Sequence, residues 1–478
     1  MSPDTRSGSL RVVIAGGGIS GLSAAFFLQQ NARQSGRQIH LTLLEASGRL
    51  GGALSTHRQG SFLLEEGADS LLRTKPSAIR LCEDLGIADS LIPTRPGPAR
   101  TLIVRDGRLM PLPEGLHLFV PTAFRPLLTT RVVSWRGKLR MALDLLLPRG
   151  GSVDESIGSF VRRRLGKEAL ERLVQPMVGG IWSGDPDSLS LCATMPQWLE
   201  MEAEYRSIIL ALRAQIRAGR LPAAAAGARY GLFLTPRCGM GRIVEALEKR
   251  LLPATARTGV AVAALQRAGG VWRVITSEGP LEADALILAL PVHVSAGLLE
   301  RVDLELHREL SAIPSSSVAT LNLVYRSGDV PVPPEGYGFV CPEVEKRALA
   351  ACTFTSRKYE GRCDDSHVIL RAYVTRPGIL QQGDESLIGA LRGDLRELLR
   401  IDAPPVAMLL RRFDRALPQL RTGHLERISK IEQRLEGLPG LALAGNALRG
   451  VGVSDCVDAA RRAADAVARE PGRVTPNT

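Results

Sequence analysis

The sequence is poor in the residues from which several kinds of site are built. Its seven cysteines are dispersed, with no C-x-x-C pair and no histidine at zinc-ligand spacing, so neither a disulfide framework nor a metal site is expected. Aromatic residues make up only 4% of the chain, and lysines number seven. No basic tail and no basic stripe with interleaved aromatics is present, which argues against nucleic acid as a partner.

Long apolar runs are also missing. No stretch reaches 18 apolar residues, so no membrane-spanning helix is expected. Residues 1–10 lack the apolar segment of a signal peptide. Together with the odd number of dispersed cysteines, these features predict a cytoplasmic protein.

What the sequence does have is length and positive charge. Its 478 residues suit two or three domains, and 45% hydrophobic with 23% charged residues is typical of a folded globular protein. Lys and Arg number 61 against 49 Asp and Glu, a net charge of +12. Because the positive residues are scattered, the favoured partner is an anionic small molecule or an anionic membrane surface.

A dinucleotide-binding motif opens the chain. The apolar run 11–15 predicts a buried strand, and Gly16, Gly18 and Gly21 follow it in the pattern G-x-G-x-x-G before a helical pattern. The first glycine permits a tight turn, the second lets a pyrophosphate reach the backbone, and the third lets helix and strand pack closely. The free N–H groups of the helix N-terminus would then bind the phosphates.

The second strand, 39–44, supports this interpretation because it ends at Glu45. That carboxylate is placed to accept hydrogen bonds from a ribose diol and would repel a 2′-phosphate. Arg49 follows, with Gly51 and Gly52, and this sequence offers a cation to the pyrophosphate and leaves room for it. The combination favours FAD over NAD.

Two later sequence segments are consistent with contact to a flavin. The small residues after Glu65-Glu66, from Gly67 to Ser70, would let backbone approach the flavin ring, although such strings alone are common in loops. The string 450–454 precedes the last predicted helix, whose N-terminus would stabilise negative charge on the reduced ring. No Ser-His-Asp set, metal cluster or P-loop appears, so no catalytic residue and no metal ligand is predicted, and the chemistry is assigned to the cofactor.

Taken together, these strings resemble the protoporphyrinogen oxidase family, which belongs to a larger FAD group with amine oxidases and carotenoid desaturases. Residues 180–185 are similar to its G-I-Y-A-G-D, and residues 206–209 to its R-S-L-I. Residues 351–358 and 370–374 resemble A-C-T-W-T-N-K-K and L-R-A-Y-V of the Gram-positive branch, which oxidises coproporphyrinogen III. The resemblance runs from about residue 10 to residue 468.

The resemblance implies an amine-oxidase-like flavoprotein of mixed α/β and α+β class in three parts. A discontinuous Rossmann-type FAD-binding domain is expected from residues 9–92, 230–302 and 434–470. A substrate-binding domain on a mixed sheet is expected from 93–112 and 303–433, and an inserted helical domain from 113–221. Residues 471–478 are expected to form a disordered tail.

The helical domain touches the bilayer in membrane-attached relatives of this family. Leu116–Val120 and Leu127–Val133 are the segments that would do so here, the alternative being that they pack on their own core.

Motifs and resemblance together predict two sets of contacts. The residues predicted to contact FAD are Gly16, Gly17, Gly18, Ile19, Ser20, Gly21, Glu45, Ala46, Arg49, Gly51, Gly52, Gly67, Ala68, Asp69, Ser70, Val262, Phe413, Val451, Gly452 and Val453. The residues predicted to contact the substrate are Lys75, Arg100, Val340, Cys352, Arg357, Lys358, Arg371 and Tyr373. In the second set the cations would hold carboxylates, and Val340, Cys352 and Tyr373 would line the cavity.

The activity implied by the resemblance is FAD-dependent oxidation of coproporphyrinogen III to coproporphyrin III in heme biosynthesis, with six electrons passed to three O2. Four propionates need more cationic partners than the two of protoporphyrinogen IX, which favours the tetracarboxylate. Protoporphyrinogen IX oxidation is the alternative, followed by a flavin amine oxidase and a non-catalytic porphyrin-binding flavoprotein. Further expectations are peripheral membrane contact, contact with a downstream heme-pathway enzyme, and a monomeric or homodimeric state.

Overall fold

Strands from three distant stretches of the chain build one parallel sheet. The computed structural model describes residues 9–96, 101–113, 115–117, 120–151, 154–221, 226–227, 232–252, 255–331 and 336–470. The order of the sheet is β13 (Ala256–Thr258), β2 (Ile39–Glu45), β1 (Leu10–Ala15), β17 (Ala285–Leu288) and β23 (Leu441–Leu443), and every neighbouring pair is parallel. The central strands are almost continuously apolar, as expected for strands covered on both faces.

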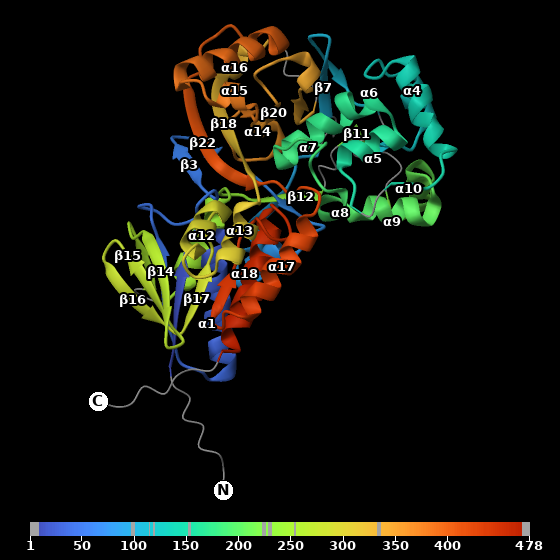
Figure 1. Cartoon of the computed structure of the whole chain (residues 1–478). Coiled ribbons are helices and arrows are strands. Elements are labelled where there is room, and N and C mark those ends of the chain that lie inside the picture. The colour runs from blue at the N-terminus through green and yellow to red at the C-terminus, as the bar shows by residue number, and fades with distance from the viewer. Residues whose placement is uncertain are drawn as a thin grey trace, which may run out of the picture.

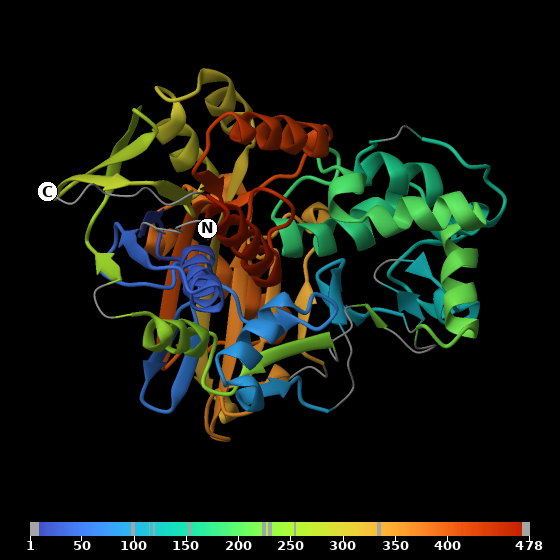
Figure 2. The same ribbon diagram turned by 90° about the horizontal axis from the view of Figure 1, so that it is seen from below.

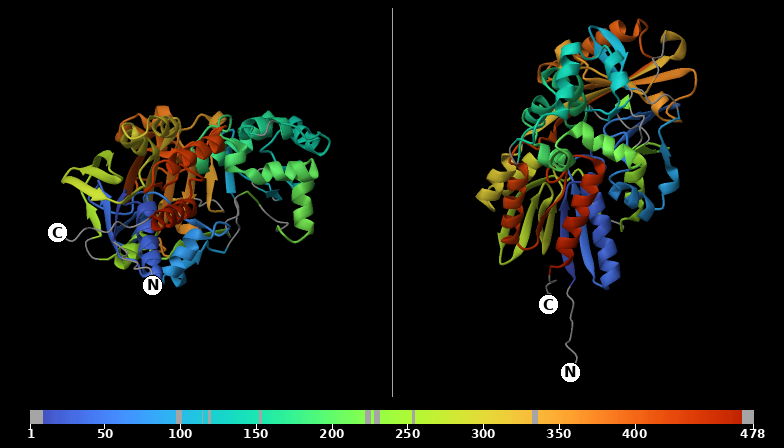
Figure 3. Two further views of the ribbon diagram at one scale, coloured as in Figure 1. Left: turned by 60° about the horizontal axis from the view of Figure 1, so that its bottom comes forward. Right: turned by 90° about the vertical axis from the view of Figure 1, so that its right-hand side faces the viewer.

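Helices cover one face of this sheet. They are α1 (Ile19–Ser35), α18 (Val453–Ala468), α11 (Gly241–Arg250) and α2 (Ser77–Asp84). Helices α1 and α18 come from opposite ends of the chain and pack side by side, as the right-hand view of Figure 3 shows. Small residues of α18, among them Ala460 and Ala464, allow this close packing.

The other face of the parallel sheet is covered by an antiparallel sheet and three helices (Figure 1). The strands are β14 (Val262–Ala268), β15 (Val271–Thr276) and β16 (Gly279–Ala283), and the helices are α12 (Val292–Leu299), α13 (Leu304–Ser311) and α17 (His424–Glu436). Helix α13 and most of α17 fall within the range 303–433 expected for the substrate domain, yet their Leu306, Leu310, Ile428 and Ile431 belong to the core behind the parallel sheet.

A seven-stranded mixed sheet forms the second part. Its order is β22 (Ala407–Pro418), β18 (Ser315–Arg326), β21 (His367–Val374), β20 (Ala351–Phe354), β19 (Gly338–Val340), β7 (Thr101–Arg105) and β8 (Arg108–Pro111). All pairs are antiparallel except β19 with β7. Leucines of α16 (Asp384–Leu399) cover one face, and the other face lies toward the parallel sheet.

The helical part projects to one side of the molecule (Figures 1 and 2). It contains α3 (Phe124–Thr129), α4 (Trp135–Ala142), α5 (Ile157–Arg164), α6 (Lys167–Ala169), a π-helix (Leu170–Val174), α7 (Gln175–Trp182), α8 (Leu191–Thr194), α9 (Pro196–Tyr205) and α10 (Ile208–Arg217). Three short strands, β9 (Leu116–His117), β10 (Val120–Pro121) and β11 (Ala226–Gly227), form a small sheet beside them.

The expected membrane-facing segments turn out to be core. Leu116, Val120, Leu127, Val132 and Val133 are each at most 4% exposed and belong to the hydrophobic core of the helical part. Of the two alternatives for these segments, packing on their own core is therefore confirmed for these five residues, which help to hold the helical part together. In the part of the chain that the structure describes, no helix is both long enough and apolar enough to cross a membrane.

Short elements connect the three parts. Strands β3 (Thr56–Gln59) and β4 (Phe62–Glu65) form a hairpin, and β5 (Leu71–Leu72), β12 (Phe233–Pro236) and β6 (Leu91–Pro93) form a three-stranded sheet. Two single-turn helices, α14 (Thr355–Lys358) and α15 (Pro377–Leu380), follow β20 and β21, and 3-10 turns occur at Ala88–Ser90, Leu143–Leu145, Ser327–Asp329 and Glu343–Glu345.

Candidate cofactor and substrate site

The first glycine turn connects β1 to α1 and leaves one side open. Gly16 has φ +107°, and a Cβ atom there would lie 2.4 Å from the carbonyl oxygen of Ala289. A Cβ on Gly21 would lie 1.8 Å from the carbonyl oxygen of Gly16. At Gly18, by contrast, no described atom lies within 4 Å of the Cβ position. The protein itself needs the first and third glycines, while the second faces open space that suits a phosphate group.

Glu45 lies beside this turn, at the end of β2. Its Oε2 accepts a hydrogen bond from the backbone N–H of Gly17 at 2.8 Å, and its Oε1 accepts from the N–H and the hydroxyl of Ser47 at 2.8 and 2.7 Å. The N–H of Val260 donates to the carbonyl of Glu45 at 2.9 Å, which brings the start of β14, with Val262, to the same edge. Ala46 is exposed next to Glu45.

The segment Arg49–Gly52 packs against the glycine turn. The N–H of Gly51 donates to the carbonyl of Gly17 at 2.8 Å, and a Cβ on Gly52 would lie 3.2 Å from the Cα of Gly18. The Arg49 guanidinium donates to the carbonyl of Gly52 at 2.9 Å and lies 3.8 Å from the carboxylate of Glu66. Half of the Arg49 side chain is exposed, so it is accessible to an anion at this turn. The structure thus brings the predicted dinucleotide contacts together.

Residues 66–70, called the 66–70 loop below, run between the two large sheets. A Cβ on Gly67 would lie 2.0 Å from the carbonyl oxygen of Ala53, so only glycine fits. Burial raises the pKa of the Glu66 carboxyl, but the hydrogen bond and charge of Arg411 and the charge of Arg49 outweigh it, so the pKa lies below its usual range. Arg411 was missed by the sequence analysis, because no strand was predicted over β22.

Asp69 in this loop forms a buried cluster with two predicted substrate contacts. Lys358 Nζ lies 3.0 Å from the Asp69 carboxylate and also donates to the Ser70 hydroxyl at 3.0 Å, while Arg371 lies 3.9 Å from Asp69. Burial raises the pKa of Asp69, but these two cations reverse the effect and hold it far below its usual range. Lys358 and Arg371 are 7% and 1% exposed, so both are engaged inside the protein.

The face of the seven-stranded sheet that carries Arg371 also carries two of the predicted apolar contacts. Cross-strand register places Val340, Ala351 and Tyr373 side by side in one row. Cys352 lies on the opposite face, in the core beneath α16, because successive residues of a strand point to opposite faces. The expectation that Cys352 lines the same cavity as Tyr373 is therefore wrong.

The N-terminus of α18 lies close to this row. Val451 and Val340 both pack against the core of the helical part, and Gly452 and Val453 begin the helix. Lys75 Nζ lies 2.7 and 2.8 Å from the two oxygens of Asp455, and the Asp455 carboxylate accepts from the N–H of Gly452 at 3.0 Å. Lys75 is thereby held at the start of α18, with half of its side chain exposed.

The remaining predicted contacts are Phe413, Arg357, Ile19, Ser20 and Arg100. Phe413 is half-buried on β22, opposite Val318, on the same face as Arg411. Arg357 is half-buried in α14, where burial lowers its pKa. Ile19 and Ser20 are buried at the start of α1. Arg100 and the expected disordered tail 471–478 lie outside the described residues.

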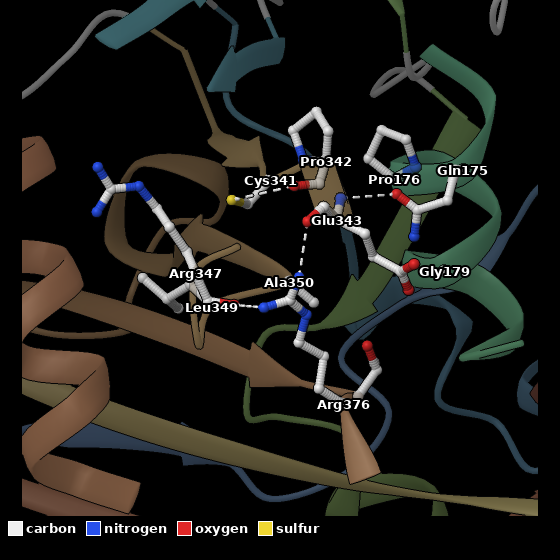
Figure 4. Close-up of a pocket in the computed structure, with 11 residues that line it drawn as sticks. Gln175, Pro176, Gly179, Cys341, Pro342, Glu343, Arg347, Leu349, Ala350 and Arg376 are labelled. Atoms are coloured by element: carbon white, nitrogen blue, oxygen red, sulfur yellow. Dashed lines mark hydrogen bonds between the residues drawn. The ribbon is translucent and has the colours of Figure 1, made fainter. Parts of the chain in front are cut away.

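A pocket between α7 and the ends of the central strands marks the join between the helical part and the seven-stranded sheet (Figure 4). The Arg376 guanidinium donates to the carbonyls of Arg347 and Glu343 at 2.6 and 2.7 Å. The N–H of Glu343 donates to the side chain of Gln175 at 3.0 Å. These hydrogen bonds cross the pocket and connect its walls, so Arg376 helps to hold the helical part against the seven-stranded sheet.

Comparison with known proteins agrees with this geometry. A sequence model of the flavin containing amine oxidoreductases matches residues 19–468. The chain belongs to this family. It is an FAD-dependent oxidoreductase, and the open glycine turn, Glu45 and the half-exposed Arg49 fit that cofactor.

Three members of the family illustrate the similarity. The coproporphyrinogen III oxidase of Bacillus subtilis is 34% identical over 95% of this chain and 97% of its own length. That of Propionibacterium freudenreichii subsp. freudenreichii is 33% identical over 100% of this chain and 94% of its own. A solved structure from Exiguobacterium sp., described as a candidate protoporphyrinogen oxidase, has a TM-score of 0.86 and 30% identity over 96% of this chain and 98% of that chain.

The glycine turn generates a paired prediction. Gly18→Ala should leave the free energy of unfolding of the apoprotein within about 0.5 kcal/mol of the wild type, because its φ of −71° suits alanine and its Cβ meets no protein atom. Its affinity for FAD should fall by about tenfold or more, since the methyl group occupies the open side of the turn. Gly21→Ala should lower both the free energy of unfolding of the apoprotein and its affinity for FAD. FAD titration of apoprotein and urea unfolding measure them, and unchanged FAD affinity in Gly18→Ala would contradict the placement of the pyrophosphate.

Proposed function

We propose that this chain catalyses the FAD-dependent oxidation of coproporphyrinogen III to coproporphyrin III. The observation that carries the proposal is its similarity, over nearly the whole length of both chains, to proteins named coproporphyrinogen III oxidase at 34% and 33% identity. Bound FAD would supply two-electron oxidation with O2 as the final acceptor, and the six-electron oxidation of one macrocycle would need three cycles, with three O2 reduced to three H2O2.

The chain's own residues hold and orient the reactants. Gly16–Gly21, Glu45 and Arg49 would hold the dinucleotide, and the 66–70 loop and the N-terminus of α18 would contact the flavin ring. The row of Val340 and Tyr373 forms one wall of the substrate site. The partial positive charge of the α18 N-terminus stabilises negative charge that develops on the reduced cofactor.

No protein base is assigned to the reaction. The two carboxylates of the 66–70 loop, Glu66 and Asp69, are each paired with cations, and their lowered pKa values keep them ionised and poor as proton acceptors at neutral pH. Protons released from the macrocycle therefore pass to solvent, and the role of these carboxylates is to fix the loop.

Positive charge on accessible side chains supports a substrate with several carboxylates. Lys75 keeps half of its side chain exposed and Arg411 45%, whereas Lys358 and Arg371 are buried. We therefore assign the contact with a substrate propionate to Lys75, together with the half-buried Arg357, and assign loop fixation to the buried pair.

The direct test is to assay the purified enzyme on coproporphyrinogen III and protoporphyrinogen IX in parallel. We expect kcat/KM for the tetracarboxylate to exceed that for the dicarboxylate by about tenfold or more, followed as porphyrin fluorescence. Faster turnover of protoporphyrinogen IX would make the second substrate the correct one. Failure to consume O2 with either, in protein fully loaded with FAD, would favour a non-catalytic porphyrin-binding flavoprotein.

Lys75→Gln tests the assigned carboxylate contact. Because an exposed ion pair is worth about 0.2–1 kcal/mol, the KM for coproporphyrinogen III should rise by about 1.5–5-fold, with a smaller rise for protoporphyrinogen IX. Lys430→Gln is the matched control, since Lys430 is also half-exposed and paired with a carboxylate, that of Glu426 on α17. Equal changes in KM for both substrates would argue against the contact.

We also propose that the helical part docks on an anionic membrane through α4 and the turn after it. Trp135, Leu139, Leu143 and Leu146 are 62, 68, 45 and 73% exposed, and the first three recur at every fourth position, so they share one face of the helix. Between residues 120 and 151 the only acid is Asp144, which is fully buried. The exposed arginines of the same stretch are Arg125, Arg131, Arg136 and Arg149.

This combination of exposed apolar side chains and exposed arginines suits the surface of an anionic bilayer. The surface lies at the outer edge of the helical part, away from the parallel sheet (Figure 1). Of the segments that the sequence predicted, Leu127–Val133 contributes only exposed Leu128 and polar residues such as Arg131 to this side, while its Leu127, Val132 and Val133 are buried.

Vesicle binding tests the membrane proposal. The protein should bind phosphatidylglycerol-containing vesicles, release them at high salt, and bind pure phosphatidylcholine weakly. Trp135 fluorescence should shift to the blue on binding, and the signal is specific because Trp182, Trp198 and Trp272 are buried. Leu139→Ser should weaken binding, whereas Leu304→Ser, at a 51% exposed leucine of α13, should leave it unchanged. Absence of binding at low salt would overturn the proposal.

A further inference from the structure

Side chains from the seven-stranded sheet hold the start of the 66–70 loop by its backbone carbonyls. The Asn322 side chain donates to the carbonyl of Glu65 at 3.0 Å, and the Thr320 hydroxyl donates to that of Glu66 at 2.8 Å. The Arg371 guanidinium donates to the carbonyl of Glu66 at 3.2 Å and to that of Gly67. Asn322 and Arg371 are direct cross-strand neighbours on β18 and β21.

Arg371 is buried in this contact between the sheet and the loop and is not exposed to a ligand. It is 1% exposed, the ring of Tyr373 lies 4.9 Å from its guanidinium carbon, and the carboxylate of Asp69 lies 3.9 Å away. A buried guanidinium is stable only when its charge is compensated and most of its N–H groups are bonded. Asp69 supplies the opposite charge, and the two carbonyls accept from Nη2, while Nε has no partner within the described residues. A substrate carboxylate would have to displace these contacts to reach it.

The direction of the two carbonyls fixes the direction of the next two N–H groups. In a planar trans peptide the C=O and the following N–H point to opposite sides. Because the carbonyls of Glu66 and Gly67 point toward the sheet, the N–H groups of Gly67 and Ala68 point away from it. Within the described part of the chain neither N–H donates to a protein acceptor.

We propose that Arg371 is a positioning residue for the cofactor: by fixing the carbonyls of Glu66 and Gly67 it aims the N–H groups of Gly67 and Ala68 at the flavin ring, and it does not bind a substrate carboxylate. This inference rests on the proposed place of the 66–70 loop beside the flavin. It also reassigns Arg371, which the sequence analysis placed among the substrate contacts, and it gives Asp69 the role of counter-ion.

Replacement of Arg371 tests the inference through the flavin itself. Arg371→Met should shift the visible absorption maxima of the bound flavin, lower its midpoint potential, because donors to a reduced ring are lost, and weaken FAD binding by about tenfold. Arg371→Lys keeps a positive charge beside Asp69 but carries it on a shorter and more flexible side chain, so the spectral shift should persist in part. The ratio of KM values for the tetra- and dicarboxylate porphyrinogens should not change.

Arg412→Met is the matched control. Arg412 also donates to two backbone carbonyls, those of Leu380 and Gln382, but it lies next to Arg411 on β22 and so points to the opposite face of the sheet. Its loss should leave the flavin spectrum, potential and affinity unchanged. If Arg371→Met does not fold, Thr320→Val provides the test. It removes a single hydrogen bond to the Glu66 carbonyl without leaving a charge unpaired, and it should shift the flavin absorption maxima in the same direction by a smaller amount.

An unaltered flavin spectrum and FAD affinity in Arg371→Met and Thr320→Val, or a rise in KM confined to coproporphyrinogen III, would overturn the inference. The spectral and binding readouts need no porphyrinogen. If the wild-type protein does not oxidise coproporphyrinogen III, the proposed substrate is refuted. The role of Arg371 is still tested, because the flavin spectrum and the FAD affinity are measured without substrate.

Discussion

The contact between the 66–70 loop and the seven-stranded sheet is the constraint on which the arrangement of the site depends. The proposed site draws on both large sheets: the glycine turn and Glu45 belong to the parallel sheet, and the row of Val340 and Tyr373 belongs to the seven-stranded sheet. Hydrogen bonds from Asn322, Thr320 and Arg371 join them at three successive carbonyls. The contact is costly to break, since separating the sheets would leave a buried guanidinium without its acceptors.

Much of the parallel sheet and its cofactor turn could be predicted, because local patterns there reflect local geometry. The strand at 11–15, the glycine turn and the acid at the end of the second strand all lie within 45 residues, and β1, α1 and β2 (Leu10–Glu45) occupy those positions in the structure. The hairpin around Asp106-Gly107 was predictable for the same reason, since φ angles of +51° and +72° at those two residues suit such a pair.

The partners of the charged residues could not be predicted, because they are set by the tertiary fold. The excess of arginine suggested a ligand, yet Arg164, Arg371, Arg376 and Arg412 each donate to backbone carbonyls inside the protein. Lys358 meets Asp69 across 289 positions of sequence. Strand β22 escaped prediction because consecutive arginines interrupt its apolar alternation. Cys352 was placed on the wrong face, and the segment 127–133 was left open between two alternatives, because a short apolar run does not reveal which face is covered.

The topology of the parallel sheet also determines when the sheet can be completed during synthesis. Its central strand β1 is synthesised long before β23 (Leu441–Leu443) and before the helix α18 that packs against α1. Until residues 441–468 have left the ribosome, β17 has an unpaired edge and α1 has an uncovered apolar side. A chain that ends before that helix would therefore expose an unpaired strand edge and an apolar helix face, features that favour aggregation over folding.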